Sequence, residues 1–388
     1  MRVAVIAPSE IPARRANTIQ VMKMCQAISA LGHEVRLAAP ASGAARPVDD
    51  ARWSELARHY GLQQRFEVEW LTAHPQLRRY DFGYRAVGWA RGWNADLLYT
   101  RLPQAAAQGS ILGVPTIYEV HDLPQGFIGP LLFRAFLRGP GKRRMVAITH
   151  SLLYDLADKL SAPVDEPFSM VAPDGVDLSR YTNLPGRDAA RRSIEKELVV
   201  NLSDQVMVAG YTGHLYRGRG VELMLATAAS LPEVIFLLVG GEPQVVGRLQ
   251  SQIQQEGLCN VILTGFIPNA ELPVYQAACD VLLMPYQRQV AASSGGDISR
   301  YLSPMKLFEY MASGRPILCS DLPVLKEVLE QDIAIFLPPD DFRAWVAAIQ
   351  DLSDDARRRA ELGRAASMNA NRYSWESRAQ RILEGISP

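Results

Sequence analysis

The stretch Val206-Met-Val-Ala-Gly-Tyr-Thr-Gly-His-Leu-Tyr-Arg-Gly-Arg-Gly220 begins as an apolar strand and ends as a glycine-rich loop. A helical segment, Val221–Ala229, follows directly. Glycine allows a backbone to approach a ligand closely, and the permanent charges of Arg217 and Arg219 suit phosphate oxygens. The loop has neither the GxGxxG nor the Walker pattern, so by itself it indicates an anion site only weakly.

The same order of strand and helix recurs along the chain, which predicts parallel βαβ units and an α/β fold. A length of 388 residues suits two domains at roughly 100–200 residues each. The strands expected in the first half are Val3–Ala7, Glu34–Ala39, Asp96–Tyr99, Pro115–Tyr118 and Met145–Ile148. Those expected in the second half are Val206–Tyr211, Val234–Val239, Val261–Leu263, Val281–Met284 and Pro316–Cys319.

Composition excludes several classes of protein. Lys+Arg and Asp+Glu both number 41, and a chain without basic excess is not expected to bind nucleic acid. No apolar run approaches the roughly 18 residues of a membrane span. The first apolar run, Val3–Ala7, is too short for a signal peptide, and the four cysteines form no CxxC pair. We therefore expect a cytoplasmic protein with free thiols.

The segment Ser303-Pro-Met-Lys-Leu-Phe-Glu-Tyr-Met-Ala-Ser-Gly314 predicts a helix whose start faces a ligand. Ser303 suits the N-cap and Pro304 the first helical position. The free N–H groups of the first turn, together with Lys306, form a reasonable anion site. Glu309 lies one turn deeper, where its oxygens can accept hydrogen bonds from two adjacent hydroxyls. A simple surface pair between Lys306 and Glu309 is the alternative.

The segment Tyr118-Glu-Val-His-Asp122 lies at the end of a predicted parallel strand. In open α/β sheets, ligands bind outside the carboxyl ends of the strands. His121 is therefore a candidate for contact with a substrate, and a purely structural role is the alternative.

These segments together resemble glycosyltransferase family 4, whose members have the GT-B fold. The resemblance covers nearly the whole chain, in order. It is carried by Leu31-Gly-His-Glu-Val35, Glu119-Val-His-Asp122, Ala172-Pro-Asp-Gly-Val-Asp177, Gly213-His-Leu-Tyr-Arg-Gly-Arg-Gly220, and Ser303–Gly314 with Arg315-Pro-Ile317. The last two are the specific motifs, and the last is common among bacterial glycan-assembly members.

The resemblance implies two Rossmann-like, doubly wound domains that face each other across a cleft. Residues 1–180 would form the acceptor-binding domain and residues 181–200 a linker. Residues 201–370 would form the domain that binds the nucleotide sugar. Residues 371–388 would form a crossover helix that packs back on the first domain, and their apolar residues do lie at helical spacing.

The resemblance also implies a retaining, metal-independent glycosyltransferase. It would move a sugar from a nucleotide-diphosphate donor to a hydroxyl of a glycan or lipid-linked acceptor in bacterial polysaccharide or glycolipid assembly. No cofactor is expected, because the nucleotide sugar is a substrate. The catalytic residues implied are His121, Arg219 and Lys306. The donor-binding residues implied are Gly213, His214, Arg217, Ile267, Asp297, Ser303, Met305, Leu307 and Glu309, and the acceptor-side residues are Asn17 and Thr18.

Two departures from the family pattern affect the donor site. His214 stands where the family has an Arg, so we expect Arg217 to supply that charge. Tyr301 stands where the family has its first Glu. We expect the loop Ser293–Ser299 to close over the donor, with Asp297 or nearby backbone N–H groups replacing the lost contacts; a mobile surface loop is the alternative.

A third departure lies before the first helix, where Ala16-Asn17 replaces a frequent Gly-Gly pair. Asn17 and Thr18 also suit the N-cap of that helix.

A metal-free mechanism also fits the residues themselves. The chain contains no Asp-x-Asp metal motif, and fixed positive charge stabilises a departing diphosphate. No carboxylate pair stands out for a double-displacement hydrolase. Two other interpretations stay open: a GT-B nucleotide-sugar 2-epimerase, and a non-catalytic relative that acts as a binding module.

Residues 127–144 combine an apolar segment, Phe127 to Leu137, with the basic cluster Lys142-Arg-Arg144. This combination suits a peripheral site on an anionic membrane surface, on the inner face of the membrane. A buried helix followed by a solvated basic turn is the alternative.

Overall fold

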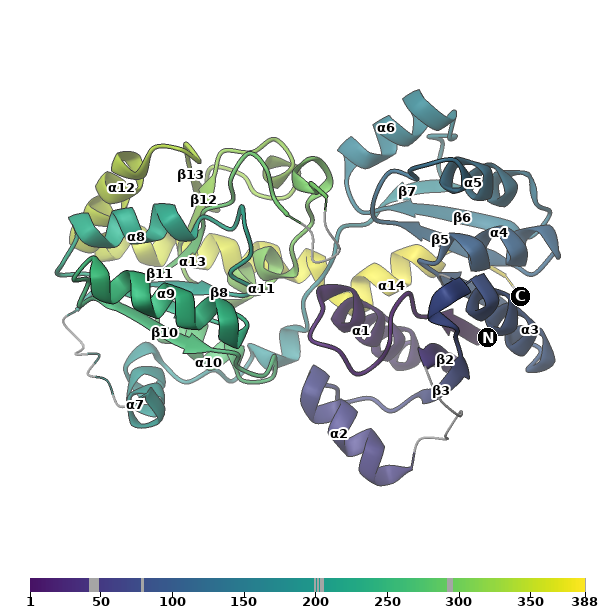
Figure 1. The fold of residues 1–388 in the computed structure, drawn as a ribbon, viewed down its shortest axis with the longest axis horizontal. Coiled ribbons are helices and arrows are strands. Elements are labelled where there is room, and N and C mark those ends of the chain that lie inside the picture. Colours follow the sequence, from purple (N-terminus) through teal and green to yellow (C-terminus); the bar gives the residue numbers. More distant parts are fainter. Residues whose placement is uncertain are drawn as a thin grey trace. The chain divides into compact units, whose positions relative to one another are not determined.

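The computed structural model describes residues 1–41, 49–77, 80–198, 200, 202, 206–291 and 296–387. The chain forms two compact units, each a parallel sheet covered by helices (Figure 1). Unit 1 is Met1–Asp174 with Trp375–Pro388, and unit 2 is Gly175–Ser374. The predicted α/β fold with two doubly wound parallel sheets is confirmed.

The sheet of unit 1 has the strand order β3-β2-β1-β4-β5-β6-β7, with parallel pairing throughout. Its strands are β1 (Arg2–Ile6), β2 (Glu34–Ala41), β3 (Glu67–Thr72), β4 (Leu97–Thr100), β5 (Thr116–Val120), β6 (Lys142–Ala147) and β7 (Ser169–Val171). The strand order reverses between β1 and β4, and such switch points are where open α/β sheets bind ligands. The outer strands β3 and β7 were not predicted, because neither is a continuous apolar run.

The helices of unit 1 are α1 (Ala16–Ala30), α2 (Asp50–Tyr60), α3 (Tyr80–Gly92), α4 (Pro103–Ile111), α5 (Ile128–Arg138), α6 (His150–Leu160) and α14 (Trp375–Leu383). Helix α14 comes from the end of the chain and packs against α1. Its apolar side chains Trp375, Ala379 and Ile382 are buried. Burial of this face accounts for the return of the chain to unit 1.

The sheet of unit 2 has the order β10-β9-β8-β11-β12-β13, again parallel, with its switch point between β8 and β11. Its strands are β8 (Val208–Thr212), β9 (Ile235–Val239), β10 (Val261–Gly265), β11 (Val281–Met284), β12 (Ile317–Ser320) and β13 (Ala334–Leu337). The sequence did not predict β13. The other five strands lie within two residues of their predicted bounds.

The helices of unit 2 are α7 (Arg187–Leu198), α8 (Val221–Ser230), α9 (Pro243–Gln255), α10 (Leu272–Ala277), α11 (Met305–Ser313), α12 (Phe342–Asp354) and α13 (Ala356–Ala370). Two apolar clusters cover the two faces of the sheet. Val208 and Leu282 belong to one cluster, and their neighbours Ala209 and Leu283 belong to the other. Strands buried on both faces in this way read as continuous apolar runs.

The expected linker, residues 181–200, contains α7, whose Ala190 and Ile194 lie in a core cluster of unit 2. The chain passes between the units at 174–175 and 374–375 instead. The charges of α7 do not all face outward, since Arg191 is buried and pairs with Asp280. Among the described residues, no helix has the length and apolar character needed to cross a membrane.

Candidate active site

Two glycine loops meet at the carboxyl edge of the unit 2 sheet. Gly213 follows β8 with φ +133°, and a Cβ atom there would lie 2.8 Å from Lys306 Nζ. Gly240 follows β9 with φ +121°, and its Cβ would lie 2.3 Å from the Gly213 carbonyl oxygen. Both positions therefore require glycine. The sequence prediction included Gly213 but missed Gly240, whose signal was the Gly-Gly pair between a strand and a helix.

Lys306, in the first turn of α11, places its ammonium at this edge. Nζ lies 3.7 Å from the ring centroid of Tyr211 and 5.5 Å from that of Tyr286. It is buried and has no hydrogen-bond partner among the described residues. Burial, reinforced by the charge of Arg219, lowers the pKa of Lys306 well below its ordinary value. A buried ammonium that lies against aromatic rings and has no hydrogen-bond acceptor is suited to an anionic ligand.

Arg219 brings a second positive charge to the same place. Its guanidinium carbon lies 4.9 Å from the ring centroid of Tyr286, so Arg219 and Lys306 share this aromatic neighbour. The two cations repel each other, and an anion between them would relieve that repulsion. Tyr211 and Tyr286 were not predicted as site residues: Tyr211 was assigned only to the strand before the glycine loop, and Tyr286 lies in no motif.

Glu309 lies one turn along α11 and is largely buried, at 9% exposure. Asn269 Nδ2 donates to Glu309 Oε1 over 3.4 Å, and Arg180 Nη1 lies 3.9 Å from the same oxygen. Arg180 Nη1 also donates to Asn269 Oδ1 at 2.8 Å. These contacts hold the carboxylate away from Lys306, so the alternative of a surface pair between Lys306 and Glu309 is not realised. Arg180 and Asn269 were missed because they lie far from Glu309 in sequence.

The side chains of the glycine loop lie in different environments. The His214 ring stacks on Tyr216, with centroids 4.7 Å apart and 5° between the planes. The side chain of Arg217 is exposed. Its backbone carbonyl accepts from Ala291 N at 3.2 Å. The structure thus places Arg219 near Lys306 and Arg217 toward solvent.

Other residues expected at the donor site lie in the core or at the start of α11. Leu307 is 1% exposed in the core, and Ile267 packs against the same cluster. Helix α11 begins at Met305, with Pro304 in the N-cap position. The predicted N-cap role of Ser303 is therefore wrong by one residue. Both Ser303 and Met305 are half-buried at the start of the helix.

Asp297 accepts hydrogen bonds from its own loop. Oδ1 accepts from Val290 N and Ser299 N, each at 2.9 Å, and Oδ2 accepts from Ser299 Oγ at 3.0 Å. These bonds hold the pKa of Asp297 below its ordinary value, although burial opposes the shift. Tyr301 is buried nearby in a short 3₁₀ turn. Residues 293–295 of the expected closing loop lie outside the described residues.

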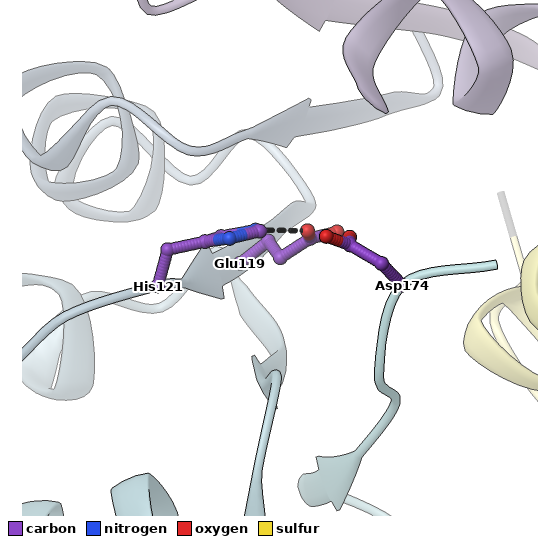
Figure 2. A group of neighbouring side chains, drawn as sticks. All are labelled: Glu119, His121 and Asp174. Atoms are coloured by element: carbon purple, nitrogen blue, oxygen red, sulfur yellow. Dashed lines mark hydrogen bonds and ion pairs between the residues drawn. The ribbon is translucent and has the colours of Figure 1, made fainter. Parts of the chain in front are cut away.

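A second polar cluster lies in unit 1, at the carboxyl end of β5 (Figure 2). Glu119, His121 and Asp174 bring their ligand atoms within 4.8 Å of one another. His121 Nε2 and Glu119 Oε1 form a short hydrogen bond. Burial, aided by the charge of Arg101, lowers the pKa of His121 to about 4. Burial raises that of Asp174 to about 6, although Arg378 and Arg101 oppose the shift.

This donor set has the residue types of a metal site, but its charges are already matched. Arg378 Nη1 lies 3.1 Å from Glu119 Oε2, and Arg101 acts on Asp174 through its charge. Two carboxylates beside two guanidinium groups leave little negative charge for a cation. The residues therefore do not fit a metal ion well, and the absence of a metal requirement stays a prediction.

The predicted capping role of Asn17 and Thr18 is wrong. Thr18 Oγ1 donates to the carbonyl oxygens of Ala13 (2.8 Å) and Arg15 (2.9 Å). Asn17 Nδ2 donates to Ser9 Oγ at 2.8 Å. Both side chains thus brace the loop after β1 instead of receiving N–H groups of α1. That loop lies at the switch point of the unit 1 sheet, which keeps both residues near a ligand-binding edge.

The apolar-basic segment divides between core and surface. Phe133 and Phe136 of α5 are buried, whereas Phe127, Ile128 and Leu131 are 84%, 49% and 48% exposed. Four basic side chains are exposed beside them: Arg134, Arg138, Lys142 and Arg143. We name these seven exposed residues the α5 surface. Arg144, which the sequence placed in the basic cluster, is buried and donates to carbonyls at the end of α14.

Family models match both units. Residues 18–180 match the model described as Glycosyltransferase Family 4, and residues 207–355 match that described as Glycosyl transferases group 1. The two segments together span most of the chain. The chain therefore belongs to the GT-B glycosyltransferases of these two domain types, which confirms the resemblance seen in the sequence.

Curated relatives are similar at a moderate level. A D-inositol 3-phosphate glycosyltransferase of Corynebacterium urealyticum is 28% identical over 55% of this chain, a match that spans only half of that protein's length. A GDP-mannose-dependent alpha-mannosyltransferase of Mycolicibacterium smegmatis is 23% identical over 97% of this chain and 94% of its own.

Solved structures share the fold at lower identity. Sucrose-phosphate synthase of Thermosynechococcus elongatus has a TM-score of 0.74 at 18% identity, covering 98% of this chain and 97% of that one. Anabaena HepE in complex with UDP has a TM-score of 0.72 at 20% identity, covering 99% of both chains. At this identity the likeness establishes the fold.

Proposed function

We propose that this glycosyltransferase is retaining and metal-independent, and that it moves a hexose from a nucleotide-diphosphate donor to a hydroxyl of a glycan or lipid-linked acceptor. In this proposal unit 2 holds the donor, unit 1 holds the acceptor, and the product enters bacterial polysaccharide or glycolipid assembly. The observation that carries the proposal is the buried ammonium of Lys306, which lacks a hydrogen-bond partner among the described residues.

The donor side follows from the charges of unit 2. The diphosphate would lie against Gly213, with Lys306 and Arg219 supplying charge to the oxygens of the leaving group. Such fixed charge is usually the largest catalytic contribution, because it needs no reorganisation during the reaction. Glu309 would accept hydrogen bonds from the ribose hydroxyls, as a carboxylate held by Asn269 can do.

The acceptor side follows from the edge of unit 1. His121, whose side chain is 18% exposed, would contact a sugar hydroxyl. The loop braced by Asn17 and Thr18 would shape the acceptor site. Glu119 is fully buried and already bonded, so it is poorly suited to act as a nucleophile. This supports retention without an enzyme-bound glycosyl carboxylate.

The comparisons support a nucleoside diphosphate as the carrier. One structural neighbour was solved with UDP-glucose, and one curated relative is described as GDP-mannose-dependent. These donors share the diphosphate and differ in base and sugar. In this proposal the shared diphosphate is the part that Lys306 and Arg219 bind.

The α5 surface supports a lipid-linked acceptor. Its apolar residues Phe127, Ile128 and Leu131 lie about one to three helical turns from Arg134 and Arg138 along the chain. Apolar side chains beside exposed basic ones suit the interface of an anionic leaflet. In this proposal the enzyme works as a peripheral protein on the cytoplasmic side of the membrane.

Transfer assays with a panel of UDP-, GDP- and ADP-sugars test the function. Transfer should proceed in EDTA, and proton NMR of the product should show the anomeric configuration of the donor. A donor at ~100 times its dissociation constant should raise stability by roughly 2.7 kcal/mol, which a thermal-shift screen detects. A requirement for Mg²⁺, an inverted product, or epimerised donor without transfer would each overturn the proposal.

Vesicle co-sedimentation tests the membrane site. Wild-type protein should bind vesicles with 30% phosphatidylglycerol at low salt, and Phe127→Ser with Leu131→Ser should abolish binding. Met368→Ser is a matched control, because Met368 is a 68% exposed apolar residue on α13. Equal binding by the double variant and the control would exclude the α5 surface.

A further inference from the structure

Arg378 of α14 reaches into the polar cluster of unit 1 and is 3% exposed. Its Nε donates to the Pro173 carbonyl at 2.7 Å and its Nη2 to the Ala172 carbonyl at 3.0 Å. Its Nη1 lies 3.1 Å from Glu119 Oε2 and 3.3 Å from the hydroxyl of Tyr99. Three nitrogens thus have fixed partners, so the position of the guanidinium is determined.

The other end of α14 is fixed as well. Arg144 of β6 donates to the carbonyl oxygens of Ile382 and Glu384, the latter at 2.9 Å. Cationic donors at the last carbonyls stabilise a helix end. The helix that carries Arg378 is therefore held at both ends within unit 1.

Glu119 links Arg378 to His121 through hydrogen bonds. With one oxygen bound by Arg378, its second oxygen, Oε1, accepts from Gln20 Nε2 at 2.7 Å and forms the short bond with His121 Nε2. Burial opposes ionisation of Glu119, but the charge of Arg378 and the hydrogen bonds from His121 and Arg378 outweigh it and hold the pKa of Glu119 below its ordinary value. An ionised carboxylate can only accept hydrogen bonds. The hydrogen on the His121 ring must therefore sit on Nε2.

The ring is neutral at physiological pH. The charged groups that face it are Glu119 on the same strand, Arg101 after β4, Asp174 after β7 and Arg378 on α14. Burial and Arg101 both disfavour the imidazolium. A neutral ring with its hydrogen on Nε2 keeps a lone pair on Nδ1.

We propose that Arg378 is a positioning residue for His121: through Glu119 it fixes the Nε2–H tautomer and so makes Nδ1 a hydrogen-bond acceptor for a sugar hydroxyl. This inference rests on the proposed function for the identity of the hydroxyl, but not for the tautomer. It makes the C-terminal helix, 259 residues beyond Glu119, a functional part of unit 1. Without Arg378, Glu119 could protonate and donate to Nε2, which would move the ring hydrogen to Nδ1.

Two-bond ¹H–¹⁵N NMR of the full chain, labelled at histidine, tests the tautomer directly. His121 is assigned by the signal lost in His121→Asn. Wild-type His121 should show a neutral ring with an unprotonated Nδ1 from pH 6 to 8. Arg378→Met and Glu119→Gln should each give mixed tautomers, and Arg378→Lys should restore the wild-type tautomer in part. Arg381→Met, an exposed change on the same helix, should leave the spectrum unchanged.

Kinetics test the consequence. Glu119→Gln and Arg378→Met should lower kcat about 100-fold, the scale of a misplaced catalytic group, with little change in donor KM. A protonated Nδ1 in wild type, or wild-type tautomer and kcat in Glu119→Gln, would overturn the inference. Glu119→Gln is nearly isosteric, so it serves if Arg378→Met does not fold. If the tautomer is as stated but no sugar nucleotide supports transfer, the proposed function fails and the positioning of His121 stands.

Discussion

The polar edges of the two sheets differ in how completely the protein satisfies them. In unit 1, both oxygens of Glu119 have donors, and two guanidinium groups face two carboxylates. In unit 2, Lys306 Nζ has no hydrogen-bond partner among the described residues, lies 3.7 Å from the ring centroid of Tyr211, and has the like charge of Arg219 nearby. The first arrangement balances its charges internally and holds a histidine, and the second is a positive site that an anion would complete. Internal satisfaction favours rigidity, whereas an unsatisfied buried charge favours a ligand.

Arg378→Met should produce the largest effect, on stability. It leaves the buried Glu119 carboxylate without its ion pair, and breaking such a pair costs about 3–5 kcal/mol of unfolding free energy. Urea denaturation of the full chain measures the loss. Arg381→Met, on the exposed side of α14, should change stability by less than about 0.5 kcal/mol.

A double-mutant cycle sharpens this test. Glu119→Gln combined with Arg378→Met removes both charges, so the double variant should be more stable than the two single losses predict. Additive losses would show that the two side chains do not form a coupled pair. The charges of the unit 1 edge would then not be internally paired, contrary to the comparison with unit 2.

Lys306→Met should have the opposite profile in unit 2. Turnover should fall by about 100- to 1000-fold, because the charge acts on the leaving group. Stability without ligand should not fall, since the change removes a buried ammonium that lacks a hydrogen-bond acceptor. Steady-state kinetics and urea denaturation of the same preparation separate the two effects.

Lys326→Met is a control for the loss of a lysine on unit 2. Lys326 is half-exposed and pairs with Asp321 outside the glycine loops. Its turnover should equal that of the wild type. A Lys306→Met variant that loses stability but keeps turnover would show that Lys306 supports the fold and does not act on the donor.

Glu309→Ala should weaken donor binding by about 1.5–3 kcal/mol, the scale of hydrogen bonds to a charged group. That corresponds to roughly 10- to 150-fold in dissociation constant, measurable by calorimetry with the donor nucleotide. Asn269→Ala should weaken binding less, because it only orients Glu309. Equal affinity of Glu309→Ala and the wild type would remove Glu309 from the donor site.

The pH dependence of stability should show the titration of the buried Asp174 and His121 in unit 1. Burial raises the pKa of Asp174 from 3.8 to about 6. The contribution of Asp174 to the free energy of unfolding is therefore complete below pH 4 and is lost as pH rises to 6. Burial and Arg101 lower the pKa of His121 from 6.5 to about 4, so its contribution is lost as pH falls through that window. The two contributions oppose each other between about pH 4 and 6.5.

Asp174→Asn removes one of these opposing contributions. Unfolding free energy should then fall more steeply from pH 6.5 to 4 than in the wild type, by about 1–3 kcal/mol over the window. Thermal melts across this range measure it. Asp158→Asn, an exposed change on α6, is the control. Parallel pH profiles for Asp174→Asn and the wild type would contradict the buried position of Asp174.

The sequence alone determined the α/β class, most of the central strands and the loops that bear His121, Gly213 and Lys306. These features are local: a buried parallel strand is a continuous apolar run, and the first turn of a helix is read from its own residues. The outer strands β3 and β7 escaped prediction, because polar or charged residues interrupt their apolar runs. The edge strand β13 was also not predicted, although its four residues, Ala334–Leu337, form an apolar run.

Only the tertiary structure decided which side chains meet. Arg378 joins Glu119 across 259 residues, and Arg180 joins Asn269 across 89. The ring of Tyr211 in β8 and that of Tyr286, two residues after β11, both lie near Lys306 Nζ. Asn17 and Thr18, expected as helix caps, instead form hydrogen bonds within the loop after β1. Arg144, expected at the surface, is buried and donates to the end of α14. A residue's type fixes which bonds it can make, whereas packing of distant segments fixes which of those bonds form, and that information is not contained in any local stretch of the chain.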